Sequence, residues 1–262
     1  MFTEIKAHAC GKVWLVGAGP GAADLLTLRA ARVIGDAEAL LYDALVESDV
    51  VALAPAACLK IRTGKRGGRA SMDQSTINLL MVRLAREGLR VVRLKGGDPS
   101  VFGRVGEEVE FLRARGVGSE VVPGVTAASA AAAQFNFPLT HRGLAQRIVF
   151  MTARLDQDAV IEDWGAAADE AVTLAVYMGG AVAGALSRQL ITAGRSPATP
   201  VLAIESAGRP QARAMRGRLD DLAQIACPVH GGPMLIVVGA VTALAEVADY
   251  GGAQAHRELL RA

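Results

Sequence analysis

Short apolar runs alternate with segments of helical periodicity along most of the chain, an alternation typical of α/β proteins. The runs are rich in valine, leucine and isoleucine and end at glycine, proline or charged residues, so each is expected to form a strand. Strands are predicted at residues 12–16, 39–42, 59–63, 90–95, 120–122, 147–151, 172–177, 200–204, 212–217 and 234–238.

Helices are predicted between these strands. Asp73 stands where an N-cap is expected, and Gly88 follows the same segment where helices commonly end in glycine. One series of alternating units ends near Pro123, which predicts two consecutive α/β domains, residues 1–122 and 123–262. The helices are expected at residues 25–34, 74–87, 106–115, 126–135, 182–193 and 219–225.

Composition removes several classes of function. The chain has 262 residues and a formal net charge of +2, and only 4% of its residues are aromatic, which argues against a nucleic-acid-binding surface. Its three cysteines are too few and scattered for a disulfide framework, and neither they nor the histidines have metal-ligand spacing. We therefore expect no metal, no nucleic-acid partner and a reducing, cytoplasmic location.

Three uncharged stretches, at residues 121–141, 171–187 and 223–245, raise the question of a membrane span. Each is interrupted by proline or by a glycine pair, so buried strand–turn–helix units explain them better than spanning helices. The first residues also lack the apolar core of a signal peptide. We expect no membrane association.

The first predicted strand runs into a glycine-rich turn, V-G-A-G-P-G. Gly17, Gly19 and Ala22 fit a dinucleotide-binding fingerprint, and Asp43 follows at the distance of a ribose partner, so a nicotinamide or flavin oxidoreductase is one hypothesis. If Asp24 caps the next helix, however, that helix begins too late to meet a pyrophosphate.

Two further turns follow apolar strands. In R-L-K-G-G-D-P, Gly96 and Gly97 allow a ligand to approach the backbone, and Asp98 precedes a proline, which predicts an extended residue whose carboxylate faces outward. In P-G-V-T-A, Thr126 and Ala127 open an alanine-rich helix whose N-terminus suits a polar ligand. Such turns at strand ends are where open α/β sheets bind ligands.

Taken in order, these motifs resemble the tetrapyrrole (corrin/porphyrin) methylase family, most closely its uroporphyrinogen-III C-methyltransferases. The resemblance runs from Lys12 to about Ala245. It rests on V-G-A-G-P-G (16–21), L-L-T (25–27), Y-D-A-L-V (42–46), R-L-K-G-G-D-P (93–99), F-G-R-V-G-E-E (102–108), P-G-V-T-A (123–127), P-L-T-H-R (138–142) and Y-M-G (177–179).

The resemblance implies a homodimer of two-domain subunits, each with a ligand cleft between its domains. It implies S-adenosyl-L-methionine as cofactor, S-adenosyl-L-homocysteine as its product, and methylation of uroporphyrinogen III at C2 and C7 to give precorrin-2 for sirohaem or cobalamin biosynthesis. The cofactor contacts carried over by position are Pro20, Gly96, Gly97, Asp98, Phe102, Thr126, Ala127, Tyr177, Met178 and Ala207.

A polycarboxylate substrate suits arginine, whose planar fork binds a carboxylate through two hydrogen bonds. Arg104 and Arg142 lie inside the matched motifs and are the main candidates. Glu107, one turn after Arg104, is the candidate base, with Asp43 as a second candidate, although Arg104 and Glu107 also fit a simple surface ion pair. Further basic candidates are Arg62, Lys65, Arg66, Arg69 and Arg147.

Within the family, a methylase of a later corrin intermediate or of a protein side chain is the alternative. The oxidoreductase hypothesis also stays open at this point. Binding of S-adenosylhomocysteine rather than NAD, NADP or FAD separates the two classes, since a ligand that binds the native state stabilises it.

Overall fold

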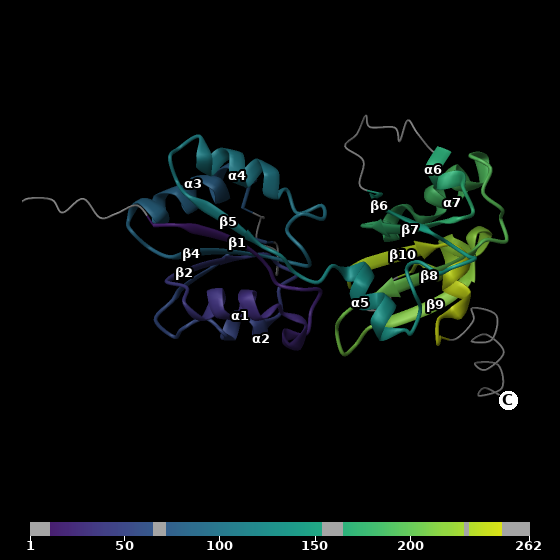
Figure 1. The fold of residues 1–262 in the computed structure, drawn as a ribbon, viewed down its shortest axis with the longest axis horizontal. Helices are drawn as coiled ribbons and strands as arrows, with labels where there is room; N and C mark the ends of the chain where they lie inside the picture. Colours follow the sequence, from purple (N-terminus) through teal and green to yellow (C-terminus); the bar gives the residue numbers. More distant parts are fainter. Residues whose placement is uncertain (1–10, 65–71, 154–164, 228–230, 248–262) are drawn as a thin grey trace, which may run out of the picture. The chain divides into compact units, whose positions relative to one another are not determined.

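A computed structural model describes residues 11–64, 72–153, 165–227 and 231–247 (Figure 1). The chain divides into two compact units, Met1–Thr126 and Ala127–Ala262, so the division falls a few residues after the predicted boundary at residue 122. Each unit is built around its own five-stranded sheet flanked by helices. Both units are therefore α/β, as the sequence predicts.

All strands of the first sheet are parallel, in the order β3-β2-β4-β1-β5. Helices α3 and α4 cover one face of this sheet and α1 and α2 the other (Figure 1). In a parallel sheet the carboxyl ends of all strands meet at one edge. The elements are β1 (Val13–Gly17), α1 (Leu28–Gly35), β2 (Ala39–Tyr42), α2 (Ser48–Ala52), β3 (Leu59–Arg62), α3 (Gln74–Arg86), β4 (Val91–Lys95), α4 (Val105–Arg113) and β5 (Ser119–Val122).

The second sheet is mixed, in the order β6-β7-β10-β8-β9, and only β6 and β7 are parallel neighbours. Helices α6, α7 and α8 pack on one face, and α5 packs on the other. The elements are α5 (Ala127–Gln134), β6 (Arg147–Thr152), α6 (Gly165–Ala168), β7 (Val172–Tyr177), α7 (Ala183–Thr192), β8 (Pro200–Glu205), β9 (Arg213–Arg218), α8 (Leu222–Ile225) and β10 (Met234–Val238).

The hydrophobic pattern located every strand to within one residue at each end. The expected cap of the first helix was wrong. Residues Ala23–Leu25 form a separate 3₁₀ turn, and α1 begins only at Leu28, after Thr27, whose Oγ1 accepts a hydrogen bond from the Ala30 amide at 3.1 Å. Asp24 therefore lies within the 3₁₀ turn and does not cap α1.

Helix α3 begins where the sequence placed it. Asp73 is its N-cap, and Oδ1 accepts a hydrogen bond from the Thr76 amide at 2.8 Å. None of the helices in the described parts of the chain has the length and apolar character that a membrane span requires.

Candidate functional site

Three glycine turns meet at the carboxyl edge of the first sheet. Gly19 and Gly97 exchange backbone hydrogen bonds, with N···O distances of 3.2 and 2.7 Å, and so join the turns after β1 and β4. A Cβ on Gly17 would lie 2.6 Å from the Gly124 backbone, and a Cβ on Gly124 would lie 2.3 Å from the Gly97 carbonyl oxygen. Glycine is thus required at 17 and 124 because three backbone segments touch there.

Gly97 differs from these tightly packed glycines. Its φ is +69°, and a Cβ built there would meet no atom within 4 Å. At Gly96 a Cβ would come within 3.4 Å of the Leu45 side chain. The backbone at Gly97 therefore borders open space at the edge where α/β sheets bind ligands, which fits a cofactor that approaches the main chain closely.

The position of Asp98 before a proline predicted that its carboxylate faces outward. This prediction was wrong. Oδ2 accepts a hydrogen bond from the Gly124 amide at 2.9 Å, and Oδ1 accepts one from the Ser100 amide at 2.8 Å and another from the Ser100 hydroxyl. Both oxygens therefore accept hydrogen bonds from the protein: Oδ2 holds the turn after β4 against the turn after β5, and Oδ1 stabilises the turn after β4 itself. Any contact of Asp98 with a ligand is additional to this structural role.

Several candidate positions have a left-handed backbone, which costs a non-glycine residue of the order of 1 kcal/mol. Phe102 and Arg104 have φ values of 54° and 58°, and Met178 has a φ of 58°. Ser206, next to Ala207, has a φ of 57°. Phe102 and Met178 are also 40% and 46% exposed. Strain of this kind concentrates at functional sites, so these outliers support a functional role for the loops that carry them.

Arg104 and Glu107 form a two-bond ion pair at the start of α4. Arg104 Nε and Nη2 donate to the two carboxylate oxygens of Glu107 at 2.9 and 2.6 Å, and both side chains are 55% exposed. The hydrogen bond from Arg104 lowers the pKa of Glu107 below its ordinary value. In this arrangement Glu107 is a weaker proton acceptor than an unpaired glutamate.

Asp43 lies at the end of β2, half-buried beside the same edge. Its Oδ1 accepts hydrogen bonds from Arg93 Nη2 at 2.5 Å and from Thr63 Oγ1 at 3.1 Å. Behind Arg93 lie Lys95 and Glu108, both buried. The sequence interpretation missed this cluster, although two cations at alternate positions of an apolar strand were a signal for it.

In the second unit, Tyr177 ends β7 and Met178 directly follows it. The Tyr177 hydroxyl accepts a hydrogen bond from the Ala128 amide at 3.3 Å, and the Tyr177 ring meets Phe150 edge to face. Tyr177 therefore also holds the first turn of α5, the helix that Ala127 opens directly after Thr126. Pro20, in the first unit, directly follows Gly19 in the β1 turn.

Ala207 is buried in the loop after β8, and Gln134 of α5 holds this loop. Gln134 Oε1 accepts a hydrogen bond from the Gly208 amide at 2.9 Å, while its Nε2 donates to the Arg209 carbonyl at 3.0 Å. Sequence reasoning missed Gln134, because a glutamine at the end of a helix has no distinctive spacing.

The other basic residues expected to bind substrate carboxylates differ in their location and in their partners. Arg142 is exposed in a tight turn closed by backbone bonds between His141 and Ala145, and it lies in a different unit from Arg104. Arg147 is paired with Asp169 at the surface. Lys65, Arg66 and Arg69 lie outside the described residues.

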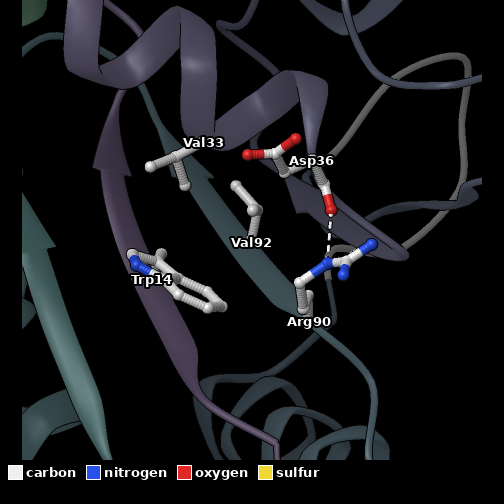
Figure 2. Close-up of a pocket in the computed structure, with 5 residues that line it drawn as sticks. All are labelled: Trp14, Val33, Asp36, Arg90 and Val92. Carbon is white, nitrogen blue, oxygen red and sulfur yellow. Dashed lines mark hydrogen bonds between the residues drawn. The ribbon is translucent and has the colours of Figure 1, made fainter.

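A small pocket of about 90 Å³ lies elsewhere in the first unit, and Figure 2 shows its lining side chains. They come from the amino-terminal parts of β1 and β4 and from the end of α1, so the pocket is remote from the glycine turns at the carboxyl ends of these strands. Arg90 Nε crosses its rim to donate to the Asp36 carbonyl at 2.8 Å. The lining residues are Trp14, Val33, Asp36, Arg90 and Val92.

Comparison with known proteins identifies the family. The family model for tetrapyrrole (corrin/porphyrin) methylases matches residues 12–223. The chain belongs to this family. The resemblance inferred from the order of the motifs is thereby confirmed, and so is the expected fold.

Two relatives of this tetrapyrrole methylase show the extent of the match. The siroheme synthase of Tolumonas auensis is 46% identical over 245 residues, which are 94% of this chain and 52% of that protein. The uroporphyrinogen-III C-methyltransferase of Paracoccus denitrificans is 44% identical over 238 residues, 90% of this chain and 83% of that protein. The chain thus spans about half the length of the siroheme synthase.

A solved structure agrees with these matches. The uroporphyrin-III C-methyl transferase of Thermus thermophilus, complexed with S-adenosylhomocysteine, superposes with a TM-score of 0.75 at 42% identity. The match covers 88% of this chain and 93% of that one. The fold of this tetrapyrrole methylase is therefore shared over almost the whole length of the Thermus protein.

Proposed function

We propose that this tetrapyrrole methylase transfers methyl groups from S-adenosyl-L-methionine to C2 and C7 of uroporphyrinogen III. The products are precorrin-2 and S-adenosyl-L-homocysteine. The observation that carries the proposal is the 44% identity to the Paracoccus uroporphyrinogen-III C-methyltransferase over 83% of that protein. The chain matches about half of the siroheme synthase, and the proposal concerns methyl transfer by this part.

The cofactor is proposed to contact the open edge at Gly97. Space beside the Gly97 backbone and the strained residues in the adjoining motifs support this placement. The further proposed contacts are those implied by the family motifs, namely Pro20, Gly96, Asp98, Phe102, Thr126, Ala127, Tyr177, Met178 and Ala207.

S-adenosylmethionine supplies a methyl group on a positively charged sulfur, which is already a good leaving group. The protein's tasks are therefore to align the substrate carbon, to exclude water and to accept the proton that this carbon loses. Arg104 and Arg142 are proposed to bind substrate carboxylates. Of the two candidate bases we favour Asp43, because Arg104 engages both carboxylate oxygens of Glu107, whereas Arg93 and Thr63 engage only Oδ1 of Asp43.

Asp43 has the better geometry for a base. Arg93 and Thr63 both hold Oδ1, and among the described residues Oδ2 accepts no hydrogen bond. One oxygen is thus oriented while the other is available to a proton.

We also propose that the protein is a cytoplasmic homodimer. Sedimentation velocity at several protein concentrations tests the dimeric state.

The direct test is incubation with uroporphyrinogen III and methyl-labelled S-adenosylmethionine under reducing conditions, followed by mass analysis. We expect two labelled methyl groups per macrocycle, with a monomethylated species appearing first. Label on an already methylated corrin or on a protein, with none on uroporphyrinogen III, would overturn the proposal in favour of the alternatives within the family.

A further inference from the structure

A network of buried charges lies directly beneath the carboxyl edge of the first sheet. Strand β4 is buried at every residue, yet it carries Arg93 and Lys95, which are only 2% and 3% exposed. As alternate residues of one strand they point to the same face. Helix α4 covers this face and contributes Glu108, which is 0% exposed.

Glu108 is the common acceptor in this network. Its two oxygens each accept a hydrogen bond from Lys95 Nζ at 2.9 Å. Oε1 also accepts from Arg93 Nε at 3.3 Å and from Gln74 Nε2, on α3, at 3.0 Å. One buried carboxylate on α4 thus holds two cations of β4 and one amide of α3.

The charges also balance. Arg93 and Lys95 are matched by Glu108 and by Asp43, which Arg93 reaches with its outer nitrogen at 2.5 Å. Burial lowers the pKa of Lys95, as does the charge of Arg93, while Glu108 acts in the opposite direction. Glu108 therefore supplies a counter-charge that favours the protonated form of the buried lysine.

Stability alone does not account for such a network. Removing several charges from water costs several kcal/mol per ion, and well-packed apolar side chains in their place are often as stable or more so. The network also orients the Arg93 side chain. Nε of its guanidinium donates to Glu108, and Nη2 donates to Asp43. It joins α4, which directly follows Arg104, to the candidate base at the end of β2.

We propose that Glu108 is a positioning residue for methyl transfer, acting through Arg93 to hold the Asp43 carboxylate at the carboxyl edge of the sheet. The proposal rests on the proposed function, because it assigns Asp43 the role of proton acceptor. Glu108 itself is enclosed by β4, α3 and α4 and does not touch the substrate.

The test compares two substitutions on the same helix. Glu108→Gln keeps the shape of the side chain and removes its charge, and Glu110→Gln makes the same change at an exposed position three residues from Glu107. We expect Glu108→Gln to lower kcat about tenfold or more, since loss of alignment at a reacting group has effects of that size. KM for both substrates and the calorimetric Kd for S-adenosylhomocysteine should change less than about threefold. Glu110→Gln should match the parent in every measurement.

A second variant covers the case in which Glu108→Gln does not fold. Lys95→Met combined with Glu108→Leu removes one charge of each sign, so Arg93 and Asp43 still balance and the melting temperature should stay near that of the parent. We expect kcat to remain low in this variant, and its crystal structure should show the Asp43 carboxylate displaced from its position against Arg93.

The outcomes separate the two proposals. If the parent binds no S-adenosylhomocysteine and methylates no uroporphyrinogen III, the proposed function fails. If the parent is active and the paired variant melts normally with parental kcat, the network is structural and the positioning role of Glu108 is overturned. Equal losses of kcat and of S-adenosylhomocysteine affinity would overturn it as well, because they indicate a general disturbance of the edge.

Discussion

Glycine serves two different purposes within one turn cluster. At Gly17 and Gly124 a side chain would collide with neighbouring backbone, whereas at Gly97 it would enter open space. The first two positions therefore keep the strand ends together, and the third leaves room beside the main chain. Substitution separates these roles, because loss of packing lowers stability and loss of space lowers ligand affinity.

Gly97→Val is expected to abolish measurable binding of S-adenosylhomocysteine in calorimetry while the protein still folds. A branched side chain would occupy the space beside the backbone, and the positive φ adds a strain of about 1–2 kcal/mol. Gly116→Val is the matched control, because Gly116 has a φ of +71° and also faces open space, but lies after α4. Both variants should melt at similarly reduced temperatures. Undiminished affinity in Gly97→Val would remove this turn from the site.

Arg104→Lys is expected to raise KM for the tetrapyrrole or lower kcat by about tenfold, because lysine keeps the charge but cannot bind a carboxylate through two parallel hydrogen bonds. The melting temperature should barely change, since exposed ion pairs contribute about 1 kcal/mol or less. Steady-state kinetics with a parallel melting curve decides the matter. Kinetics equal to those of the parent would show that Arg104 and Glu107 form only a surface ion pair.

At the scale of elements, the N-cap of α3 links the stability of the first unit to pH. Asp73 accepts hydrogen bonds from the Ser75 hydroxyl at 2.6 Å and from the Thr76 amide and hydroxyl at 2.8 Å. The bond from Ser75, followed by those from Thr76, lowers the pKa of Asp73 from 3.8 to about 2. Helix α3 in turn carries Gln74, which bonds to Glu108.

The first unit should consequently lose stability as Asp73 becomes protonated. A carboxyl group whose pKa is lower in the folded state stabilises the fold above its unfolded pKa, and this contribution disappears as pH falls from about 4 towards 2. Asparagine also caps helices well but does not titrate. The melting temperature of the parent, followed by circular dichroism, should therefore fall relative to that of Asp73→Asn over this range. A constant difference between the two would contradict the prediction.

At the scale of the whole molecule, the two units differ in how their sheets are made. The first is fully parallel, so all its strand ends and their turns lie at one edge. The second is mixed, and its candidate residues Met178 and Ala207 follow two strands, β7 and β8, that both pair with β10. A ligand that binds only the native protein stabilises it, so the proposed cofactor product should raise the melting temperature.

S-adenosylhomocysteine at about one hundred times its Kd should add about 2.7 kcal/mol and raise the melting temperature by about 5 °C or more. NAD, NADP and FAD at the same concentrations should leave it unchanged. Differential scanning fluorimetry provides the measurement, with Gly97→Val as the control that should not respond. A shift with a dinucleotide and none with S-adenosylhomocysteine would revive the oxidoreductase hypothesis for the first glycine turn.

The strands, the α/β class and the family could all be predicted from the amino-acid sequence alone. Strand positions follow from local runs of apolar residues. Such a run predicts a strand whatever position that strand takes in the sheet. The motif order likewise needs no coordinates, since each glycine turn follows its strand directly. The same local reasoning identified Asp73 as a helix cap, but it chose Asp24 rather than Thr27 for α1, because a 3₁₀ turn intervenes.

Which charges are buried depends on tertiary packing and could not be predicted from the sequence. Glu107 and Glu108 are adjacent and chemically alike, and successive helix residues point about 100° apart. The packing of α4 against the first sheet turns Glu108 towards Arg93 and leaves Glu107 at the surface with Arg104. Asp98 also turns inward because the Gly124 amide, distant in sequence, lies beside it. These choices depend on which elements pack together, and no local pattern contains that information.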